Sequence, residues 1–245
     1  MALYACSDLH GQYGLFQQML EGIHFSMEDT LFILGDVIDR GPGSIPMLLD
    51  IMSRPNVFCV MGNHELMMYE YYKRSRFGSA WLYAANGGRM TKQAFEQLRA
   101  HERMKILSYI EEMSMQIDVF AEDMHFLLSH SDFLPEKENV KFQDVDFATA
   151  CNIVWRSPWR TCEYVPESKY AEDGRVHVIG HVPTQRILGA NRPEAYVDAE
   201  HMIINIDLGC AAIEGSFFTT GRLCCLNLTK LSRGEGREAF TYYLP

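Results

Sequence analysis

Three short apolar runs in the first 65 residues each end in a polar cluster, and this repeated arrangement is the strongest constraint on the fold. The runs are Leu3 to Cys6, Thr30 to Leu34 and Val57 to Met61, and helical patterns over Tyr13 to Gly22 and Ile45 to Met52 separate them. Alternating strand and helix patterns predict βα units and therefore an α/β fold. Because ligands bind beyond the carboxyl ends of strands in such sheets, we expect the polar clusters to meet at one edge.

The later part of the chain is less regular. Residues from Leu66 to Met115 are rich in Met, Tyr and charged residues and predict a helical insert beside the site. Further strands are predicted over Met124 to Leu128, Val176 to Ile179, Met202 to Ile206 and Leu223 to Leu228. The polar stretches Pro135 to Asp146 and Pro158 to Asp173 are interpreted as loops. Since the polar clusters must converge, we expect one domain over residues 1–245.

Composition narrows the classes of partner. The chain has 245 residues, of which 47% are hydrophobic, so it can bury a substantial core. Its formal net charge of −10 argues against a nucleic acid polymer as partner, because such binding needs broad Lys and Arg patches. Any phosphate site must therefore be a local group of positively charged side chains.

Cysteine usage and hydropathy predict a cytoplasmic protein. The seven cysteines are odd in number and lack the spacing of a metal or disulfide framework. Cys6, Cys59 and Cys151 lie in apolar stretches and are expected to be buried thiols. No secretory signal pattern is recognised, and no apolar run approaches the roughly 18 residues that span a bilayer.

The polar clusters contain the donors that bind a pair of divalent metal ions. The candidate ligands are Asp8, His10, Asp36, Asn63, His130 and His181. A carboxylate such as Asp36 can bridge two ions about 3.5–4 Å apart. Asp8 and His10 are spaced i, i+2, so in an extended segment both side chains face one ion. Asn63, His130 and His181 would complete the site of the second ion. A water bridging such ions attacks phosphorus in line, so phosphate ester hydrolysis is the first hypothesis.

Four further residues are candidates for catalysis and phosphate binding. His64 is next to a predicted ligand and is the candidate general acid, and Asp39 is expected to hold its second ring nitrogen. Arg40 is expected to contact the phosphate oxygens, since its planar guanidinium suits bidentate binding. Arg156 is a second candidate for the same role.

Two histidines compete with the predicted ligands. His125 and His177 are alternatives to His130 and His181 respectively. We prefer the later member of each pair because it ends its apolar run, where a strand-end ligand belongs. The other histidines, His24, His101 and His201, have no such context and are interpreted as solvated or structural.

Each motif alone also has a structural interpretation. An Asp-x-His triplet is common, and residues 35–41 could form a turn with a surface ion pair. Residues 62–65 could form a helix start with Glu65 in the first turn, and Asn86-Gly87-Gly88 is interpreted as a helix-breaking turn. The joint occurrence of the first three motifs, in order and each after a strand, favours the two-metal interpretation.

The motifs resemble those of the calcineurin-like metallophosphoesterases, specifically the phosphoprotein phosphatase group. The resemblance rests on Asp8-x-His10-Gly11, Gly35-Asp36-x-x-Asp39-Arg40-Gly41, Gly62-Asn63-His64-Glu65 and Gly180-His181. Residues 81–91, 155–156 and 206–210 are similar to bacterial members of that group. The resemblance implies a four-layer α/β/β/α sandwich with metal ions at the sheet edge, manganese first, with iron and zinc as alternatives.

The resemblance also implies roles for individual residues. By motif, one metal ion would be held by Asp8, His10 and Asp36, and the second by Asp36, Asn63, His130 and His181. His64 and Asp39 would form the acid pair, and Arg40 would bind phosphate. Two features depart from the pattern. Ser131 and Asp132 follow His130, where small residues are usual, which would bring an extra carboxylate near the site, and the region around Arg156 matches loosely.

Three functions follow from the resemblance. The leading prediction is a Ser/Thr protein phosphatase of bacterial type, with a phosphorylated protein or peptide as partner. The nearest alternative is a symmetrical dinucleoside tetraphosphate hydrolase, whose partner is a small phosphate ester. A third is a phosphate-binding protein of the same fold without activity, which the intact set of candidate residues argues against. The surfaces that select a substrate are expected to come from the insert and the loops.

Overall fold

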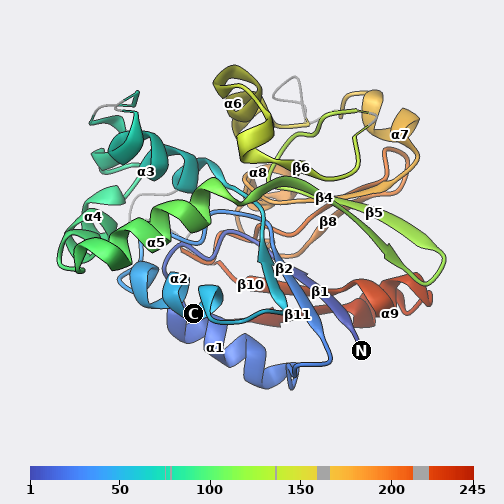
Figure 1. Ribbon diagram of the computed structural model, residues 1–245. Coiled ribbons are helices and arrows are strands. Elements are labelled where there is room, and N and C mark those ends of the chain that lie inside the picture. Colours follow the sequence, from blue (N-terminus) through green and yellow to red (C-terminus); the bar gives the residue numbers. More distant parts are fainter. Residues whose placement is uncertain (75, 78, 136, 159–165, 212–220) are drawn as a thin grey trace.

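The computed structural model consists of two β-sheets packed face to face with helices on their outer sides (Figure 1). It describes residues 1–74, 76–77, 79–135, 137–158, 166–211 and 221–245. Figure 1 shows α1 and α2 on the outer side of one sheet and α7 on the outer side of the other.

The first sheet has five strands in the order β11-β10-β1-β2-β3. Its strands are β1 (Leu3–Cys6), β2 (Thr30–Ile33), β3 (Val57–Cys59), β10 (Leu223–Asn227) and β11 (Phe240–Tyr243). The three N-terminal strands are parallel, and β10 pairs antiparallel with β1. The helices α1 (Tyr13–Gly22) and α2 (Ser44–Met52) are the crossovers between the parallel strands. The βα units predicted for the N-terminal segment are therefore present.

The second sheet has six strands in the order β6-β4-β5-β7-β9-β8. They are β4 (Ser114–Ala121), β5 (Met124–Ser129), β6 (Val140–Lys141), β7 (Val176–Ile179), β8 (Tyr196–Asp198) and β9 (Ile203–Asn205). The central strands β5, β7 and β9 are parallel. The two sheets thus bring parallel strands from both parts of the sequence to the middle of the molecule.

Alternation of side chains along the strands produces the layers. In β5, Phe126 and Leu128 belong to the core between the sheets, whereas Leu127 packs on the outer side with Tyr170. In β2, the same period of two sends Ile33 to the helices and its neighbour to the core between the sheets. The predicted four-layer α/β/β/α arrangement is therefore confirmed.

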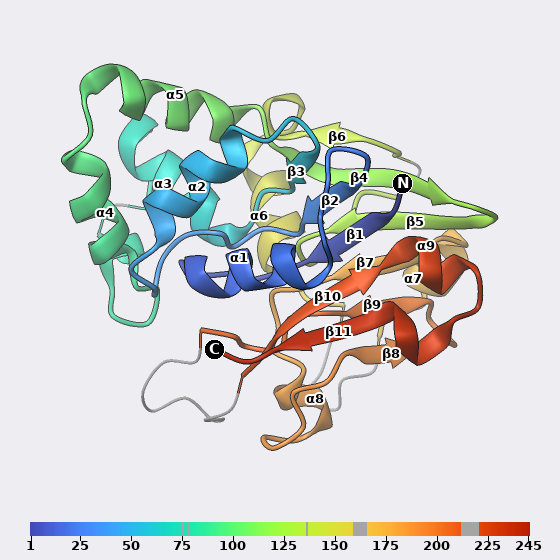
Figure 2. The same cartoon turned by 90° about the horizontal axis from the view of Figure 1, so that it is seen from below.

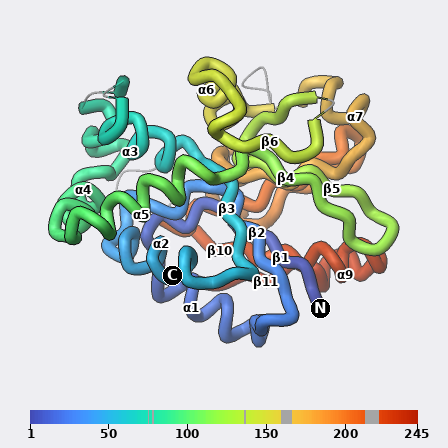
Figure 3. Tube along the Cα trace, viewed as in Figure 1, coloured from blue at the N-terminus to red at the C-terminus, as the bar shows by residue number. Residues whose placement is uncertain are grey.

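A group of helices lies at one end of the molecule, and Figures 2 and 3 show it from two sides. Its elements are α3 (Asn63–Lys73), the 3-10 turn η1 (Ala80–Leu82), α4 (Gly88–Glu96) and α5 (Ala100–Glu111). The chain packs α3 and η1 together before it continues into α5 and β4. These helices lie almost entirely in the part of the chain, Leu66 to Met115, for which the sequence predicted a helical insert.

The remaining helical elements lie along the C-terminal half of the chain. They are η2 (Phe142–Asp144), α6 (Phe147–Trp155), α7 (Lys169–Asp173), α8 (Gln185–Leu188), α9 (Leu228–Ser232) and η3 (Gly236–Ala239). Aromatic packing joins one of them to the second sheet, because the Tyr170 ring of α7 lies 5.0 Å from Phe133 and 4.9 Å from His177.

Three predictions of local structure were wrong in part. The helical segment ends at Glu111, and Ser114 and Met115 already belong to β4. The stretch 135–146, expected to be a loop, contains β6 and η2, and the stretch 158–173 contains α7, with residues 159–165 outside the described part. The strand β6 has only two residues, which is too short to show a period of two in the sequence. It forms because Lys141 and Val140 pair with β4.

The described cysteines agree in part with the predictions from the sequence. The six described cysteines are free thiols, of which Cys6 and Cys59 are buried as expected and Cys151 is only half-buried. Cys162 lies outside the described residues. Among the described helices, none is long and apolar enough to cross a membrane.

We predict that His177 makes the protein less stable as the pH falls from about 6.5 to about 4. Burial lowers the pKa of His177 to about 4 from 6.5, while Asp173 opposes the shift and Arg175 and Lys169 add to it. The unfolded chain therefore takes up this proton first, which removes about 3 kcal/mol from the free energy of unfolding across that window. Urea unfolding of metal-stripped His177→Phe is expected to show a weaker pH dependence than the wild type.

The surface residue His101 supplies the matched control, since it is exposed. The variant His101→Asn is expected to keep the wild-type pH dependence. An equal pH dependence in His177→Phe and the wild type would show that His177 is not the buried neutral group described above.

Candidate metal centre

Five strands of the two sheets end at the same place, and each is followed by candidate residues. The strand β1 is followed by Asp8 and His10, β2 by Asp36, Asp39 and Arg40, β3 by Asn63 and His64, β5 by His130, and β7 by His181. Backbone hydrogen bonds join these segments directly, from Gly180 N to His130 O at 2.9 Å and from His10 N to Asp36 O at 2.8 Å. The structure therefore brings together the strand-end residues that the sequence proposed.

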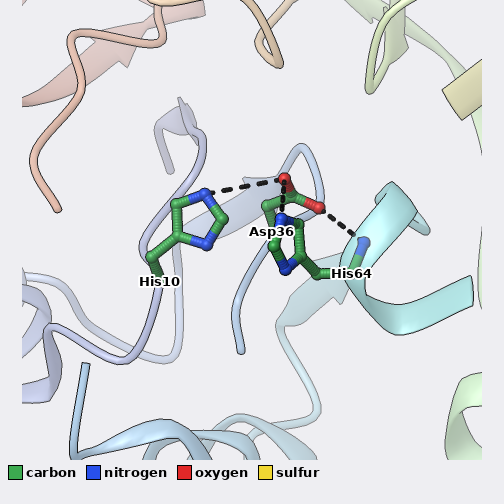
Figure 4. A group of neighbouring side chains, drawn as sticks. All are labelled: His10, Asp36 and His64. Atoms are coloured by element: carbon green, nitrogen blue, oxygen red, sulfur yellow. Dashed lines mark hydrogen bonds and ion pairs between the residues drawn. The ribbon is translucent and has the colours of Figure 1, made fainter. Parts of the chain in front are cut away.

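The carboxylate of Asp36 lies at the centre of this cluster. Its Oδ2 is 3.6 Å from His10 Nε2 and 3.8 Å from His64 Nε2 (Figure 4). Its Oδ1 is 3.6 Å from His130 Nε2. Burial opposes ionisation, but His130, His64, His10 and His181 together hold the pKa of Asp36 well below its usual range. A charged, buried carboxylate surrounded by imidazoles is a suitable bridging ligand for cations.

Two overlapping sets of donors around Asp36 are able to hold a metal ion. Within the described residues, one set is His10, Asp36 and His64, and the other is Asp36, His130 and His181. In each set the donor atoms lie within 4.8 Å of one another. The second set agrees with the predicted second ion, whereas the first includes His64 where the prediction placed Asp8.

Backbone carbonyls orient two of these histidines. The Nδ1 of His10 is 3.0 Å from Ile38 O, and the Nδ1 of His130 is 2.7 Å from Leu34 O. Because a carbonyl oxygen only accepts, each Nδ1 must carry a hydrogen, so in the neutral imidazole the lone pair lies on Nε2, the atom that faces Asp36. Such a carbonyl partner is the usual support of a metal-binding histidine.

The remaining candidate ligands border this arrangement. The Asp8 carboxylate accepts hydrogen bonds from the Ser7 hydroxyl and, at 3.0 Å, from His181 N, and burial raises its pKa to about 6. The ring of His181 lies 5.0 Å from that of His130, and burial lowers the pKa of His181 to about 3. The last candidate, Asn63, has its Oδ1 3.0 Å from His130 Nε2. Neutral imidazoles of this kind are the form that binds metal.

His64 is held by an acidic partner on the side away from Asp36. Its Nδ1 is 2.7 Å from Asp39 Oδ2, and the same oxygen accepts a hydrogen bond of 2.7 Å from Trp81 Nε1. Burial disfavours the charged imidazole, but Asp36 and Asp39 raise the pKa of His64 above its usual value. Trp81 was not among the partners predicted from the sequence, although it lies in the segment 81–91, which is similar to bacterial phosphoprotein phosphatases.

Glu65 joins the loop after β2 to the start of α3. Its Oε2 accepts hydrogen bonds from Asp36 N at 2.9 Å and Gly62 N at 3.1 Å, and its Oε1 accepts from Val37 N at 2.9 Å and Ile38 N at 3.2 Å. Burial raises the pKa of Glu65 to about 7, and the amide donors favour the charged form. Glu65 was predicted only as a first-turn residue, and a carboxylate three residues after a helix start is the signal for part of this role.

Close packing at this junction explains one of the motif glycines. A Cβ on Gly62 would lie 2.2 Å from Asp36 Oδ1 and 2.3 Å from Asp36 N, which leaves no room for a side chain. The candidate site also contains most of the strained backbone. Among the described residues, positive φ values at non-glycine positions include those of Asp8, His10, Asp36, Asp39, Arg40 and His181, and only three lie elsewhere. Strain of this kind clusters at functional sites.

The two candidate phosphate ligands lie in different environments. The Nη2 of Arg40 is 3.4 Å from His64 Nε2, so its guanidinium borders the cluster. The guanidinium of Arg156 instead contacts two carboxylates, Glu167 at 2.9 Å and Asp132 at 3.8 Å. Arg40 is therefore the better placed of the two.

Asp132 does not crowd the cluster as the sequence analysis expected. Its Oδ1 accepts hydrogen bonds from Lys169 Nζ, from Tyr170 OH at 3.0 Å and from Phe133 N at 2.8 Å. These partners hold the carboxylate toward α7 and the outer layer of the molecule.

The competing histidines have partners elsewhere. His125 Nε2 is 2.6 Å from Asp118 Oδ2, and the His177 ring packs against Phe133 with 4.3 Å between ring centroids. Neither residue belongs to the two donor sets around Asp36. The position at the end of the apolar run was therefore a useful criterion.

Comparison with known sequences and structures agrees with this fold. Two curated relatives are a symmetrical bis(5'-nucleosyl)-tetraphosphatase from Wigglesworthia glossinidia brevipalpis, 40% identical over 76 residues, and serine/threonine-protein phosphatase 2 from Escherichia coli (strain K12), 28% identical over 132 residues. These alignments cover 30% and 54% of this chain, and only 28% and 58% of the relatives' own lengths.

Solved structures show the same fold at low sequence identity. A crystal structure described as that of a proposed diadenosine tetraphosphatase has a TM-score of 0.65 and 14% identity, with 99% of this chain and 92% of that chain covered. A protein serine/threonine phosphatase from Saccharomyces cerevisiae has a TM-score of 0.54 and 14% identity, with 100% and 80% covered.

The sequence profile of the calcineurin-like phosphoesterases matches residues 1–206, which is most of the chain and includes the proposed metal ligands. Together with the two-sheet architecture and the carboxylate and imidazole cluster at the sheet edge, this match shows that the chain belongs to the calcineurin-like phosphoesterase family.

Proposed function

We propose that this protein hydrolyses phosphate esters with two divalent metal ions held around Asp36. The observation that carries the proposal is the pair of donor sets that share this carboxylate. Their chemistry fits metal binding, since they combine a charged carboxylate with imidazoles whose Nε2 atoms face it. The proposed ligands are Asp8, His10, Asp36, Asn63, His130 and His181, with manganese as the first choice. When bound, such a pair of ions polarises the phosphoryl group and lowers the pKa of water at the site.

The chain's own residues then position the substrate and supply a proton. Arg40 borders the cluster with a guanidinium that suits the phosphate oxygens. His64 donates a proton from Nε2 to the oxygen of the leaving group, while its Nδ1 stays bonded to Asp39. The oxygen of a water molecule bonds to phosphorus, the bond from phosphorus to the leaving oxygen breaks, and the proton released by water returns to His64 through solvent.

Two substrate classes are consistent with this site. The match to the E. coli protein phosphatase supports the predicted Ser/Thr protein phosphatase activity, and the tetraphosphatase relatives support hydrolysis of a dinucleoside tetraphosphate. In both classes a phosphorus atom with a leaving oxygen would face the cluster, so the residues around Asp36 do not separate them. The third function, a phosphate-binding protein without activity, is disfavoured by the intact pairing of His64 with Asp39.

The direct test of the proposal is hydrolysis of p-nitrophenyl phosphate by protein that has been stripped of metal and resupplied with manganese. We expect no turnover in the stripped protein and turnover after manganese is added. Turnover that is equal with and without metal would contradict the proposal.

The variant His64→Ala is expected to retain two metal ions and to hydrolyse esters with poor leaving groups about 10² to 10⁴ times more slowly, because loss of a general acid has this effect. Metal content measured by mass spectrometry and turnover of an alkyl phosphate check both parts. Loss of one metal equivalent would instead assign His64 as a ligand, which its place in the first donor set makes a real alternative.

The variant Asp36→Asn is expected to weaken both metal sites, because the amide removes the shared negative charge. Equilibrium dialysis against manganese should show lower affinity for both equivalents. A matched variant is Asp50→Asn, because Asp50 lies on α2 away from the cluster and its carboxylate pairs with Arg54. Two tightly bound ions in Asp36→Asn would show that Asp36 does not bridge them.

A further inference from the structure

A cavity of about 270 Å³ opens beside Arg40, between the loop after β2 and the segment from η1 to α4. Its walls include Arg40, Leu82, Tyr83, Arg89 and Met90. Because Arg40 also borders the Asp36 cluster, this cavity lies next to the place where the attacked phosphate is proposed to bind. A group attached to that phosphate would enter it.

The cavity has a positive lining in an acidic protein. It contains two arginines and no Asp or Glu among its described lining residues, although the chain has a net charge of −10. Arg89 Nε donates a hydrogen bond of 2.9 Å to Leu82 O, which fixes the guanidinium at the cavity wall. Within the part of the chain that the structure describes, no ion pair joins Arg89 to a carboxylate. Its terminal nitrogens are therefore available to an anionic ligand.

One wall of the cavity contacts the backbone of Arg40 directly, at Gly87. The backbone N–H of Arg40 donates to Gly87 O at 3.4 Å, and Gly87 has a φ of +76°. A Cβ on Gly87 would lie 2.8 Å from Arg40 N and 2.9 Å from Arg40 Cα. The Asn86-Gly87-Gly88 segment is thus more than a helix-breaking turn, since only glycine allows the insert to approach the phosphate arginine this closely.

The same wall offers flat and polarisable apolar surface. The Tyr83 side chain is 59% exposed and that of Met90 is 48% exposed, although both line the cavity. An exposed tyrosine ring beside a positive group is a surface on which nucleobases stack. The adjacent methionine can pack against an aromatic ring through its sulfur.

We propose that this cavity binds the leaving half of a dinucleoside polyphosphate, with the second phosphate at Arg89 and the base against Tyr83. The inference rests on the proposed hydrolytic function and names its substrate class. Water adds to the phosphorus held by Arg40, and the bond from that phosphorus to the bridging oxygen breaks. The leaving nucleotide keeps the bridging oxygen, which receives its proton from His64.

The test compares the manganese enzyme on diadenosine tetraphosphate, a phosphothreonine peptide and p-nitrophenyl phosphate. In Arg89→Met, the ratio of kcat/KM for diadenosine tetraphosphate to that for p-nitrophenyl phosphate is expected to fall about 10-fold to 100-fold, the loss that one charge-assisted contact predicts. Arg89→Lys is expected to restore part of the ratio. The control Arg233→Met, which removes an exposed arginine paired with Glu122, is expected to keep the wild-type ratio.

The outcomes separate the cavity from the chemistry. A wild-type ratio in Arg89→Met overturns the assignment of the cavity, as does wild-type protein that hydrolyses p-nitrophenyl phosphate but not diadenosine tetraphosphate. A selective loss of phosphothreonine peptide hydrolysis in Arg89→Met also overturns it, and assigns the cavity to protein substrates. Failure of the metal-loaded wild type to hydrolyse any of the three substrates contradicts the proposed function itself.

Discussion

The buried carboxylate of Glu65 joins the two backbone segments on which the candidate metal centre depends. Its two oxygens accept four amide hydrogen bonds, three from the loop after β2 and one from Gly62 before α3. Those segments carry Asp36 and the pair Asn63 and His64. Unpaired buried amides each cost on the order of 1–3 kcal/mol, so this single side chain stabilises a loop that would otherwise be unfavourable. The Asp36 carboxylate, the proposed shared metal ligand, is thus positioned by hydrogen bonds between its loop and Glu65, which do not depend on a bound cation.

The same region gathers positive side chains and imidazoles in an acidic protein. Asp36 keeps its charge because imidazoles surround it, and the described lining of the cavity beside Arg40 contains two arginines and no Asp or Glu. Arg40, the arginine proposed to bind phosphate, has a backbone held in a left-handed conformation with φ of 64°. Backbone strain, glycine contacts and carbonyl partners therefore act together to aim a small number of side chains at one point. Charges on the far surface of the protein have little influence on this cluster, because solvent and salt screen interactions between distant charges.

The sequence predicted the strand-end clusters well for a physical reason. Parallel strands must end at one edge, so polar residues after β1, β2 and β3 had to meet whatever the details of the loops. The choice of His181 over His177 followed from the same rule, and the structure places only His181 beside His130. These were consequences of local pattern and strand direction alone.

Other features depend on contacts between distant segments and left no local pattern. The pairing of β6 with β4 and the capture of Asp132 by Lys169 both join residues that are more than 20 positions apart. Arg156 contacts Glu167, which no motif indicated. The cavity beside Arg40 was likewise invisible, because it forms only when Gly87 packs against the loop after β2.

Anomalous diffraction from crystals soaked in manganese tests the central claim most directly. We expect two anomalous peaks, one on each side of the Asp36 carboxylate, with the Nε2 atoms of His10 and His130 facing different peaks. A single peak, or peaks that lie away from Asp36, would contradict the assignment of this cluster as a two-metal centre.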